Sequence, residues 1–471
     1  MSREDKLSSV PATAKQDGDS DPHGGVEPAV WTARMLAALE RGVKGGVWFS
    51  LMDKVYAPRN LQAAFKRVAR NKGGAGVDHE SVDMYASNLE ANLQRLHEQL
   101  RDDSYRPQAI RRHNIPKPGS KQMRPLGIPT VRDRVAQTAL RNVLEPIFER
   151  DFAEHSYGFR PKRGCKDALR RVHGLLRDGH RWVVDADLAS YFDTIPHDKL
   201  MALVERKIAD GRVLKLIRAY LEQEVVGDME PWSPETGTPQ GAVISPLLAN
   251  LYLDPLDHLM VERKFEMVRY ADDLVILCKN EHEAQQAHQT LQQWVEQAGL
   301  RLHPEKTRVA NLNEPREGFD FLGYRFQRTD RGHISKWPRK KSERNLRNKV
   351  RAMTRRRTNG QSMECIISQL NPLVRGFFEY FKHSASSSLQ ALDQWIRGRL
   401  RSILRNRNHR RGRARGRDHQ RWPNAYFGEL GLFCMTEARA QALPIPPGVT
   451  ADRRAVCGRT ARTVRRGVRP G

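Results

Sequence analysis

The amino-acid sequence predicts an α+β fold, in which helices pack on a core of strands. Two apolar segments, 182–188 and 268–277, contain many β-branched residues and are too short for core helices, so they are predicted as buried strands. Longer segments around them place apolar residues every three or four positions, as amphipathic helices do. A chain of 471 residues is long enough for two or three such domains.

The elements are justified in order from the N-terminus. Residues 1–28 are rich in Ser, Gly, Asp and Pro and lack periodicity, so we assign residues 1–45 to a disordered extension. Helical spacing of apolar residues then occurs over 48–70, 89–100 and 132–152. Between these helices, residues 110–129 contain four prolines and alternate basic with apolar residues, which predicts an extended hairpin.

Positive charge is concentrated at the C-terminal end. The whole sequence has a formal charge of +26, and residues 331–471 carry +25 of it. Between 331 and 430 the basic residues are interleaved with apolar and aromatic ones, which favours folded helices over a solvated tail. We therefore predict a basic helical domain over 331–435 that contacts a nucleic-acid backbone, followed by a flexible basic tail over 436–471.

The sequence lacks the features of several other protein classes. The five cysteines are scattered without a C-x-x-C pair, so neither a disulfide framework nor a zinc site is expected. No apolar run approaches the roughly 18 residues of a membrane span, and the acidic first residues do not resemble a signal or transit peptide. These observations predict a reducing, cytoplasmic location and no membrane partner.

Carboxylates interrupt both predicted strands. Asp187 stands at the end of the first strand, and Asp272 and Asp273 lie within the second, after Tyr270. Burying an unpaired carboxylate is costly unless a cation binds it. An Asp-Asp pair is also common in a tight hairpin turn, and such a turn can present both carboxylates to a metal. If the strands are adjacent, the three carboxylates can hold two Mg²⁺ for in-line nucleotidyl transfer.

An ordered series of motifs surrounds these carboxylates. It comprises IPKP at 115–118, RPLGIP at 124–129, SYGFRP at 156–161, DLASYFDTI at 187–195, GTPQGAVISPLLAN at 237–250, YADD at 270–273 and FLGY at 321–324. The series resembles the motifs of bacterial and organellar group II intron reverse transcriptases. The resemblance extends over about 51–435 and implies a right-hand polymerase, with fingers and palm over 46–330 and a helical thumb after them.

The resemblance also implies the metal site. It assigns Asp187, Asp272 and Asp273 as the metal-binding and catalytic carboxylates, with the Leu188 carbonyl as a further oxygen ligand for two Mg²⁺. Asp185 competes with Asp187 because both lie on the same strand face. Only Asp187 is followed five residues later by an aromatic, as the family pattern requires. That aromatic, Phe192, is similar to the steric gate that excludes ribonucleotides, and the alternative is an ordinary core phenylalanine.

Further residues are assigned to the nucleotide and the primer. Lys117 and Arg124 resemble a pair that grips the dNTP triphosphate, and the alternative is that both are surface bases that contact the template. Gln240 follows the family's P-Q-G turn and is expected over the incoming sugar and base. The predicted primer grip comprises Phe321, Leu322 and Gly323.

The C-terminal third resembles the maturase, or X, domain of the same proteins. The motif is LNPLVRGFFEYF at 370–381, where Asn371 is expected to cap a helix. The segments RWPNAYF at 421–427 and LGLF at 430–433 resemble the class C lineage, in which the optional DNA endonuclease domain is absent. Predicted RNA contacts are Arg160 and Arg163 near the palm, and Arg375, Arg397 and Arg399 with the arginine-rich run that ends at Arg417.

The predicted function is that of an RNA-directed DNA polymerase, a nucleotidyltransferase encoded by a group II intron. It would copy intron RNA into cDNA for retrohoming and assist splicing as a maturase. The expected partners are group II intron RNA, an RNA template with a DNA primer, target DNA and dNTPs, and homodimer formation stays open. Two alternatives are an RNA-binding maturase that only assists splicing, and a host-recruited reverse transcriptase that is not tied to an intron.

Overall fold

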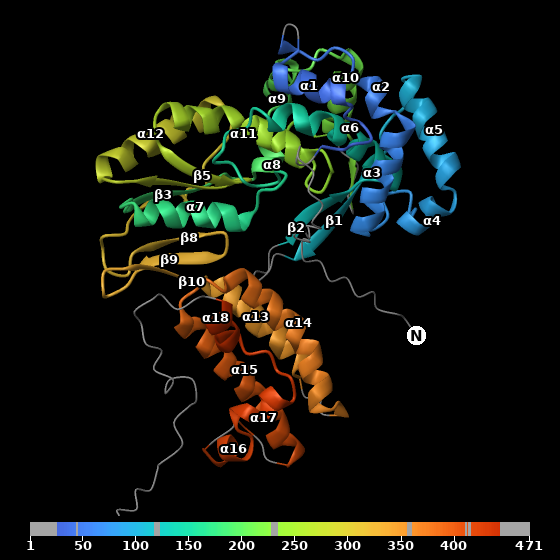
Figure 1. Cartoon of the computed structure of the whole chain (residues 1–471). Coiled ribbons are helices and arrows are strands. Elements are labelled where there is room, and N and C mark those ends of the chain that lie inside the picture. The colour runs from blue at the N-terminus through green and yellow to red at the C-terminus, as the bar shows by residue number, and fades with distance from the viewer. Residues whose placement is uncertain are drawn as a thin grey trace, which may run out of the picture. The chain divides into compact units, whose positions relative to one another are not determined.

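The structure is a computed structural model and describes residues 26–43, 46–116, 123–227, 234–355, 360–409, 412 and 416–442. The chain divides into two compact units. The first contains Met1–Leu322 and Phe326–Ile334, and the second contains Gly323–Arg325 and Ser335–Gly471. Figure 1 shows strands and helices in the first unit and a group of helices in the second.

The first unit contains most of the helices. They are α1 (Ala33–Arg41), α2 (Met52–Val55), α3 (Pro58–Asn71), α4 (Val82–Ser87), α5 (Leu89–Arg101), α6 (Val131–Glu149), α7 (Cys165–Arg177), α8 (Tyr191–Thr194), α9 (His197–Glu205), α10 (Gly211–Leu221), α11 (Ser245–Glu262) and α12 (Glu281–Gln297). Helix α6 is buried along almost its whole length and packs against α3. It therefore forms the centre of the helical core, as its uninterrupted apolar spacing predicts.

A four-stranded antiparallel sheet holds the carboxylates. Its order is β5 (Glu266–Tyr270), β6 (Asp273–Cys278), β3 (Trp182–Asp187) and β7 (Arg308–Asn311). Helices α7, α11 and α12 pack on this sheet. Val184 and Ala186 of β3 belong to the helical core, so the alternating residues Asp185 and Asp187 lie on the opposite face.

The predicted strand over 268–277 is two strands, because Ala271 and Asp272 form a tight turn between β5 and β6. The predicted hairpin over 110–129 is confirmed by the antiparallel pairing of β1 (Ile110–Pro116) with β2 (Met123–Ile128). The short strand β4 (Val225–Val226) adds to the other edge of β1. The chain thus has a second, smaller sheet beside the first.

The division between the two units falls within a third sheet. This sheet has the order β10 (Ile334–Pro338), β9 (Tyr324–Arg328) and β8 (Gly318–Phe321). The second unit then contains α13 (Lys340–Met353), α14 (Met363–Phe381), α15 (Ser386–Arg407), α16 (Gly416–Arg421), α17 (Asn424–Glu429) and α18 (Met435–Ala442). These helices share an apolar core of their own, which includes Leu370, Leu400 and Phe427.

Both predicted disordered ends are partly wrong. Helix α1 lies inside the segment 1–45, and its N-terminus is capped by Thr32. Trp31 is buried and its indole N–H donates to the Asn142 carbonyl over 3.0 Å, which attaches this segment to the core. At the other end, α18 extends into the predicted tail 436–471, and residues after 442 lie outside the described part of the chain.

Helix α18 is held in place by one buried carboxylate. Asp393 of α15 accepts hydrogen bonds from the backbone N–H of Met435 over 3.1 Å and of Thr436 over 2.9 Å. The predicted cap at Asn371 is also wrong, because Asn371 and Pro372 lie inside α14. The Asn371 amide instead donates to the Gly431 carbonyl over 2.8 Å, so it fixes the loop before α18.

Candidate active site

The three predicted metal ligands lie around the tip of the β5–β6 hairpin. The register places Asp187 of β3 directly opposite Asp273 of β6, so both side chains lie on the same face of the sheet. Asp272 occupies the turn, where Ala271 has φ of 58°. The left-handed conformation of Ala271 produces the tight turn that brings Asp272 beside the two strand carboxylates.

Backbone N–H groups of β8 and of the residue that follows it bind two of the nearby carboxylates. The backbone N–H of Asp320 donates to the Asp185 carboxylate, and the backbone N–H of Leu322 donates to that of Asp273. Burial is the main cause that raises the pKa of Asp185 to about 6 and the pKa of Asp273 to about 7. Asp185 also lies 4.0 Å from the Arg308 guanidinium, and the register pairs it with Val275. Asp187 is paired with Asp273 at the hairpin tip, so it remains the better ligand candidate.

Asp187 and Asp272 have different electrostatic surroundings. The Lys306 ammonium forms an ion pair with Asp187, which balances the charge of this partly exposed carboxylate. Burial, together with the charge of Asp187, raises the pKa of Asp272 above its ordinary value. A nearby cation would therefore stabilise the ionised form of both carboxylates.

These residues fit divalent cations by the chemistry of their donors. Carboxylate and carbonyl oxygens are the ligands that Mg²⁺ prefers. Across the described residues, no three His, Cys, Asp or Glu side chains are already gathered as a metal-binding group. The Leu188 carbonyl is available, because the bridge between Leu188 and Leu302 uses the carbonyl of Asp187 and the N–H of Ala189 instead.

A buried ion pair positions the turn formed by Ala271 and Asp272, the candidate catalytic turn, and sequence reasoning missed it. Arg269 is only 1% exposed. Its Nε donates to Asp257 Oδ1 over 2.7 Å, and its terminal nitrogen donates to the Ala271 carbonyl over 3.0 Å. The same nitrogen donates to Asn250 over 3.1 Å. A charged residue inside an apolar strand was the available signal, since such a residue is buried only when it is paired.

The SYGFRP loop lies directly against this turn. Asn250 donates to the Gly158 carbonyl over 2.7 Å, and the Tyr157 N–H donates to the Arg269 carbonyl over 2.9 Å. A Cβ atom on Gly158 would lie 2.3 Å from the Ala271 nitrogen. Only glycine permits this approach of two backbones, which explains why the loop requires it at this position.

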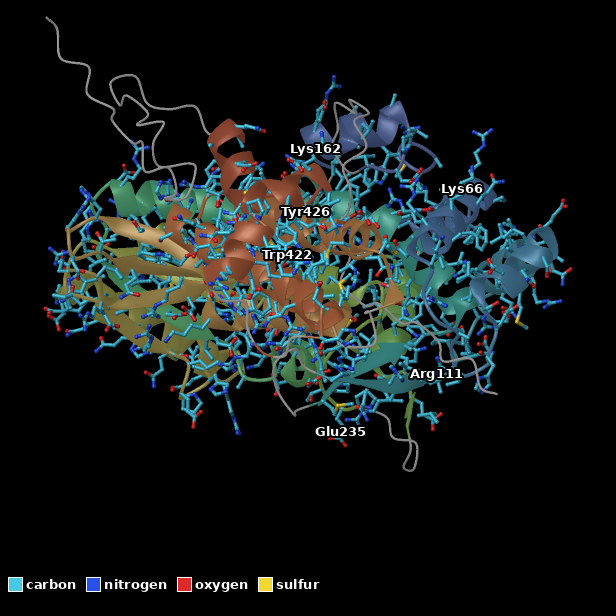
Figure 2. The ribbon with its side chains drawn as sticks, turned by 90° about the horizontal axis from the view of Figure 1, so that it is seen from below. Lys66, Arg111, Lys162, Glu235, Trp422 and Tyr426 are labelled. Carbon is cyan, nitrogen blue, oxygen red and sulfur yellow. The ribbon has the colours of Figure 1, made fainter. Side chains whose placement is uncertain are left out.

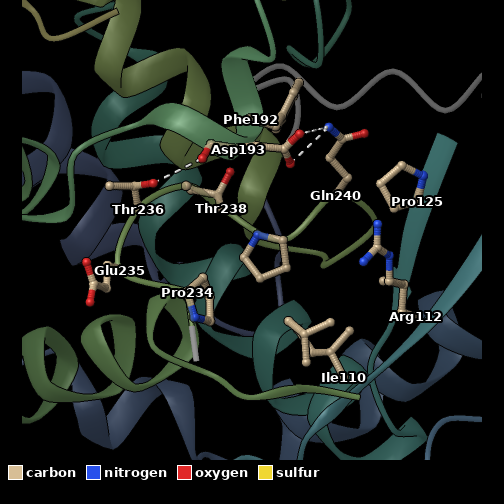
Figure 3. Close-up of a pocket in the computed structure, with 14 residues that line it drawn as sticks. Ile110, Arg112, Pro125, Phe192, Asp193, Pro234, Glu235, Thr236, Thr238 and Gln240 are labelled. Atoms are coloured by element: carbon tan, nitrogen blue, oxygen red, sulfur yellow. Dashed lines mark hydrogen bonds between the residues drawn. The ribbon is translucent and has the colours of Figure 1, made fainter. Parts of the chain in front are cut away.

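A cavity of about 480 Å³ lies next to Phe192. Figure 3 shows its lining, which comes from β1, β2, β4, α8 and residues 234–240. Gln240 donates to both Asp193 oxygens over 3.2 and 3.3 Å, and the Arg124 Nε donates to the Gln240 oxygen over 2.9 Å. The structure therefore joins the predicted nucleotide ligands Arg124 and Gln240 directly, and it adds Asp193, which the sequence did not suggest, as the residue that holds the Gln240 amide.

The loop that carries Gln240 is fixed by backbone bonds on both sides. The Thr238 N–H donates to the Phe192 carbonyl, and the Gly127 N–H donates to the Gln240 carbonyl, each over 2.6 Å. Gly241 has φ of 109°, and a Cβ there would lie 2.4 Å from the Gly127 oxygen. Phe192 is 8% exposed and belongs to the apolar core while it also lines the cavity. Lys117 lies outside the described residues.

The predicted primer grip forms the turn after β8. Leu322 and Gly323 have φ of 46° and 81°, so two left-handed residues reverse the chain. Phe321 is 1% exposed, and its ring is therefore part of the interior. The Leu322 N–H that binds Asp273 links this turn to the carboxylates of the sheet.

The predicted template contact at Arg160 is wrong. Its guanidinium is buried, forms an ion pair with Glu149 at 2.9 Å and donates to the Ser156 carbonyl over 2.9 Å. These internal bonds leave no free edge for a phosphate. Arg163 is half-buried and donates to the Glu154 carbonyl, with its guanidinium 5.9 Å from the centre of the Tyr157 ring.

The arginines of α15 that were predicted to contact RNA also make contacts within the second unit, and the phosphate-binding role of the run stays a prediction. Arg399 donates to the carbonyl and hydroxyl of Thr354 over 2.7 and 3.1 Å, and Arg401 is buried and donates to the Trp422 carbonyl over 2.8 Å. Arg397 is half-buried near the Cys434 sulfur. Arg375 is exposed, with its guanidinium 4.6 Å from the centre of the Phe433 ring. The carbonyl groups at the end of a helix have no acceptor role within that helix, so Arg399 and Arg401 supply donors for the carbonyls that follow α13 and α16.

The first unit carries a row of basic residues that the charge count did not indicate, because the net charge of residues 1–330 is close to zero. Arg59, Lys66 and Arg70 lie on one exposed face of α3, and Figure 2 shows Lys66 extending away from that helix. None of the three has an ion-pair partner among the described residues. Within the described residues, no helix is long and apolar enough to cross a membrane.

The amino-acid sequence is similar to those of known reverse transcriptases and intron-encoded proteins. Residues 115–326 match the reverse transcriptase (RNA-dependent DNA polymerase) family, and residues 332–422 match the group II intron maturase-specific domain. Protein YkfC of Escherichia coli is 34% identical over 319 residues, which cover 59% of this chain and 83% of YkfC. The group II intron-encoded protein LtrA of Lactococcus lactis is 35% identical over 248 residues, which cover 51% of this chain and 41% of LtrA.

One solved structure, telomerase from Candida albicans with a fragment of telomeric RNA, is 15% identical, with a TM-score of 0.41 over 73% of this chain and 68% of that chain. This low score adds no support, and the assignment depends on the sequence matches. Reverse transcriptases use divalent metal ions, and reverse transcriptase and maturase domains bind RNA. The chain therefore belongs to the family of group II intron reverse transcriptases with a maturase-specific domain.

Proposed function

We propose that this protein is an RNA-directed DNA polymerase that uses two Mg²⁺ and dNTPs to extend a DNA primer on an RNA template. The observation that carries the proposal is the register that sets Asp187 opposite Asp273, with Asp272 in the adjoining turn. Three carboxylates from two strands and one turn form a surface for cations beside a cavity of nucleotide size.

The residues of the site have different roles in binding the cations. Asp187 and Asp272, with Asp273 and the Leu188 carbonyl, would hold the cations. When bound, two Mg²⁺ supply activation of the primer hydroxyl and neutralisation of the triphosphate. Lys306 would release Asp187 as the cations bind, because an ammonium and a metal ion compete for the same carboxylate. The Arg269–Asp257 pair keeps the turn in position throughout.

The adjoining cavity would bind the dNTP. Arg124 presents a guanidinium that can form two hydrogen bonds with phosphate oxygens, and Lys117 is its predicted partner. Asp193 orients the Gln240 amide, which orients Arg124 in turn. Phe192 lines the same cavity, which supports its role as the gate against a ribose 2′-hydroxyl.

We further propose that the second unit supports intron splicing as a maturase and that the cDNA serves retrohoming. The match to the maturase-specific domain over 332–422 supports this. Group II intron RNA and target DNA are the proposed partners, in the cytoplasm. An intact set of metal-site carboxylates disfavours a maturase without polymerase activity, and the maturase match disfavours a polymerase that is not tied to an intron.

Primer extension on an RNA template tests the proposal. Asp272→Asn and Asp187→Asn each remove a ligand without changing side-chain volume, so both should abolish cDNA synthesis while RNA affinity and thermal stability stay near wild type. Asp198→Asn is the matched control, because that side chain is 97% exposed on α9. Extension by Asp272→Asn at the wild-type rate would exclude this metal site.

A parallel splicing assay with the cognate intron tests the second unit. Asp272→Asn should still support splicing, because a folded basic surface and not the metal site is needed. Equal loss of both activities in every variant would contradict separate maturase and polymerase roles.

A further inference from the structure

An exposed aromatic ring stands beside the catalytic turn, and the site as described above does not use it. Phe159 of the SYGFRP loop is 46% exposed, whereas the neighbouring Phe192 is 8% exposed. The two rings meet edge to face, with centroids 6.4 Å apart and planes at 83°. A single exposed phenylalanine is common on a protein surface, so the reason to consider this ring as a binding residue is its position: it contacts Phe192, and the residue before it contacts the Ala271 backbone.

The backbone holds this ring outward at a cost. Phe159 has φ of 59°, a left-handed conformation that is unfavourable for a bulky residue. Such conformations persist where surrounding structure imposes them, and they concentrate at functional sites. Here the imposing structure is visible on both sides: the Gly158 carbonyl accepts from Asn250 over 2.7 Å, and the Arg160 side chain is fixed by Glu149.

The position of the ring relates it to both halves of the site. Gly158, its neighbour in the chain, contacts the Ala271 backbone of the catalytic turn. Phe192, its neighbour in space, lines the cavity that contains Gln240 and Asp193. Phe159 itself is not among the lining residues, but its ring contacts Phe192, which lines the cavity, and aromatic rings bind the faces of bases and sugars.

We propose that Phe159 is a nucleotide-binding residue that packs against the nascent base pair and forms, with Phe192, an aromatic platform for the incoming dNTP. This rests on the proposed polymerase function. The rigid mounting is the essential feature, because a ring held in place before binding loses little conformational entropy when the nucleotide arrives. The platform therefore contributes to dNTP binding more than to the chemical step.

Phe159→Asn tests the platform without disturbing the loop. Asparagine tolerates a left-handed backbone better than most residues, so the variant removes the ring and keeps the turn. Single-nucleotide addition should show a KM for dNTP raised about 5- to 150-fold, the range that corresponds to loss of one base–aromatic contact. The kcat should change less, and the Kd for the primer–template should stay at the wild-type value. Phe159→Tyr, which keeps the ring, should restore the KM.

Controls separate this inference from other effects. Phe49→Asn removes a different exposed phenylalanine, 69% exposed, and should leave the KM unchanged. An unchanged KM in Phe159→Asn, or a change confined to primer–template affinity, would overturn the platform. If Phe159→Asn does not fold, Phe159→Leu gives the same test, since it keeps an apolar side chain without an aromatic face. A wild-type protein that extends no primer would instead overturn the proposed polymerase function.

Discussion

Gly158→Ala should impair catalysis through a contact that can be measured in the structure. The added Cβ would lie 2.3 Å from the Ala271 nitrogen and 2.9 Å from the Tyr270 carbonyl carbon. An ordinary contact starts near 3.4 Å, so the turn or the loop must move by about 1 Å. Both neighbouring atoms are backbone atoms of the catalytic hairpin, and no flexible side chain can absorb the shift.

Gly158→Ala should affect both the rate of nucleotide addition and the free energy of unfolding. A displacement of about 1 Å at a reacting centre lowers a rate by about 10²-fold, which corresponds to about 2.7 kcal/mol in the activation free energy. Overpacking a filled interior lowers the free energy of unfolding by about 1–3 kcal/mol. Because Asp272 follows Ala271 directly, we expect kcat for single-nucleotide addition to fall while the Kd for the primer–template is kept.

Pre-steady-state primer extension and thermal denaturation measure the two costs separately. Gly174→Ala is the control, because Gly174 lies inside α7 and a Cβ there meets no atom within 4 Å. Alanine inside a helix is more favourable than glycine by about 0.5–1 kcal/mol, so this variant should be slightly stabilised and fully active. A Gly158→Ala protein with wild-type kcat and wild-type melting temperature would refute the close approach of loop and turn.

Three further predictions concern the charged residues. Asp257→Asn should lower the free energy of unfolding by about 3–5 kcal/mol and reduce cDNA synthesis, because it leaves Arg269 buried without its carboxylate, and urea denaturation with primer extension checks this. Asp254, whose pKa burial raises to about 6, favours its protonated form in the folded state, so wild-type stability should fall as pH rises from about 4 to 6. Asp254→Asn should not lose stability in this pH range. At pH 7 its free energy of unfolding should therefore exceed that of the wild type by up to about 3 kcal/mol, and at pH 4 the two should be equal. Urea midpoints measured across this range check the prediction. Replacing the exposed α13 residues Arg344 and Lys349 with Gln should flatten the slope of log K against log[salt] for RNA binding by about 0.7–0.9 per lost phosphate contact. Arg401→Gln should instead lower the melting temperature, because Arg401 is buried and donates to the Trp422 carbonyl. An identical salt response of the two variants would contradict this distinction between exposed and buried basic residues.

The sequence by itself determined the family, the α+β class and the order of the catalytic motifs. These follow from local signals: alternation or helical spacing of apolar residues, prolines in a hairpin, and carboxylates within apolar strands. The hairpin of β1 and β2 was predicted in this way, and its register confirms it. The concentration of charge beyond residue 330 was likewise readable by counting.

Only the tertiary structure decided which charged groups are available to ligands. Asp185 and Asp187 are two residues apart on one strand face, and they differ because β8, more than 130 residues later, donates a backbone N–H to Asp185. Arg160 and Arg401 resemble surface bases in the sequence, yet both are buried in the folded chain, where Glu149 pairs with Arg160 and the Trp422 carbonyl accepts from Arg401. Burial depends on partners brought together by folding, and no local pattern contains that information. The same reason explains why Arg269 and Asp193 emerged as positioning residues only when their contacts were seen.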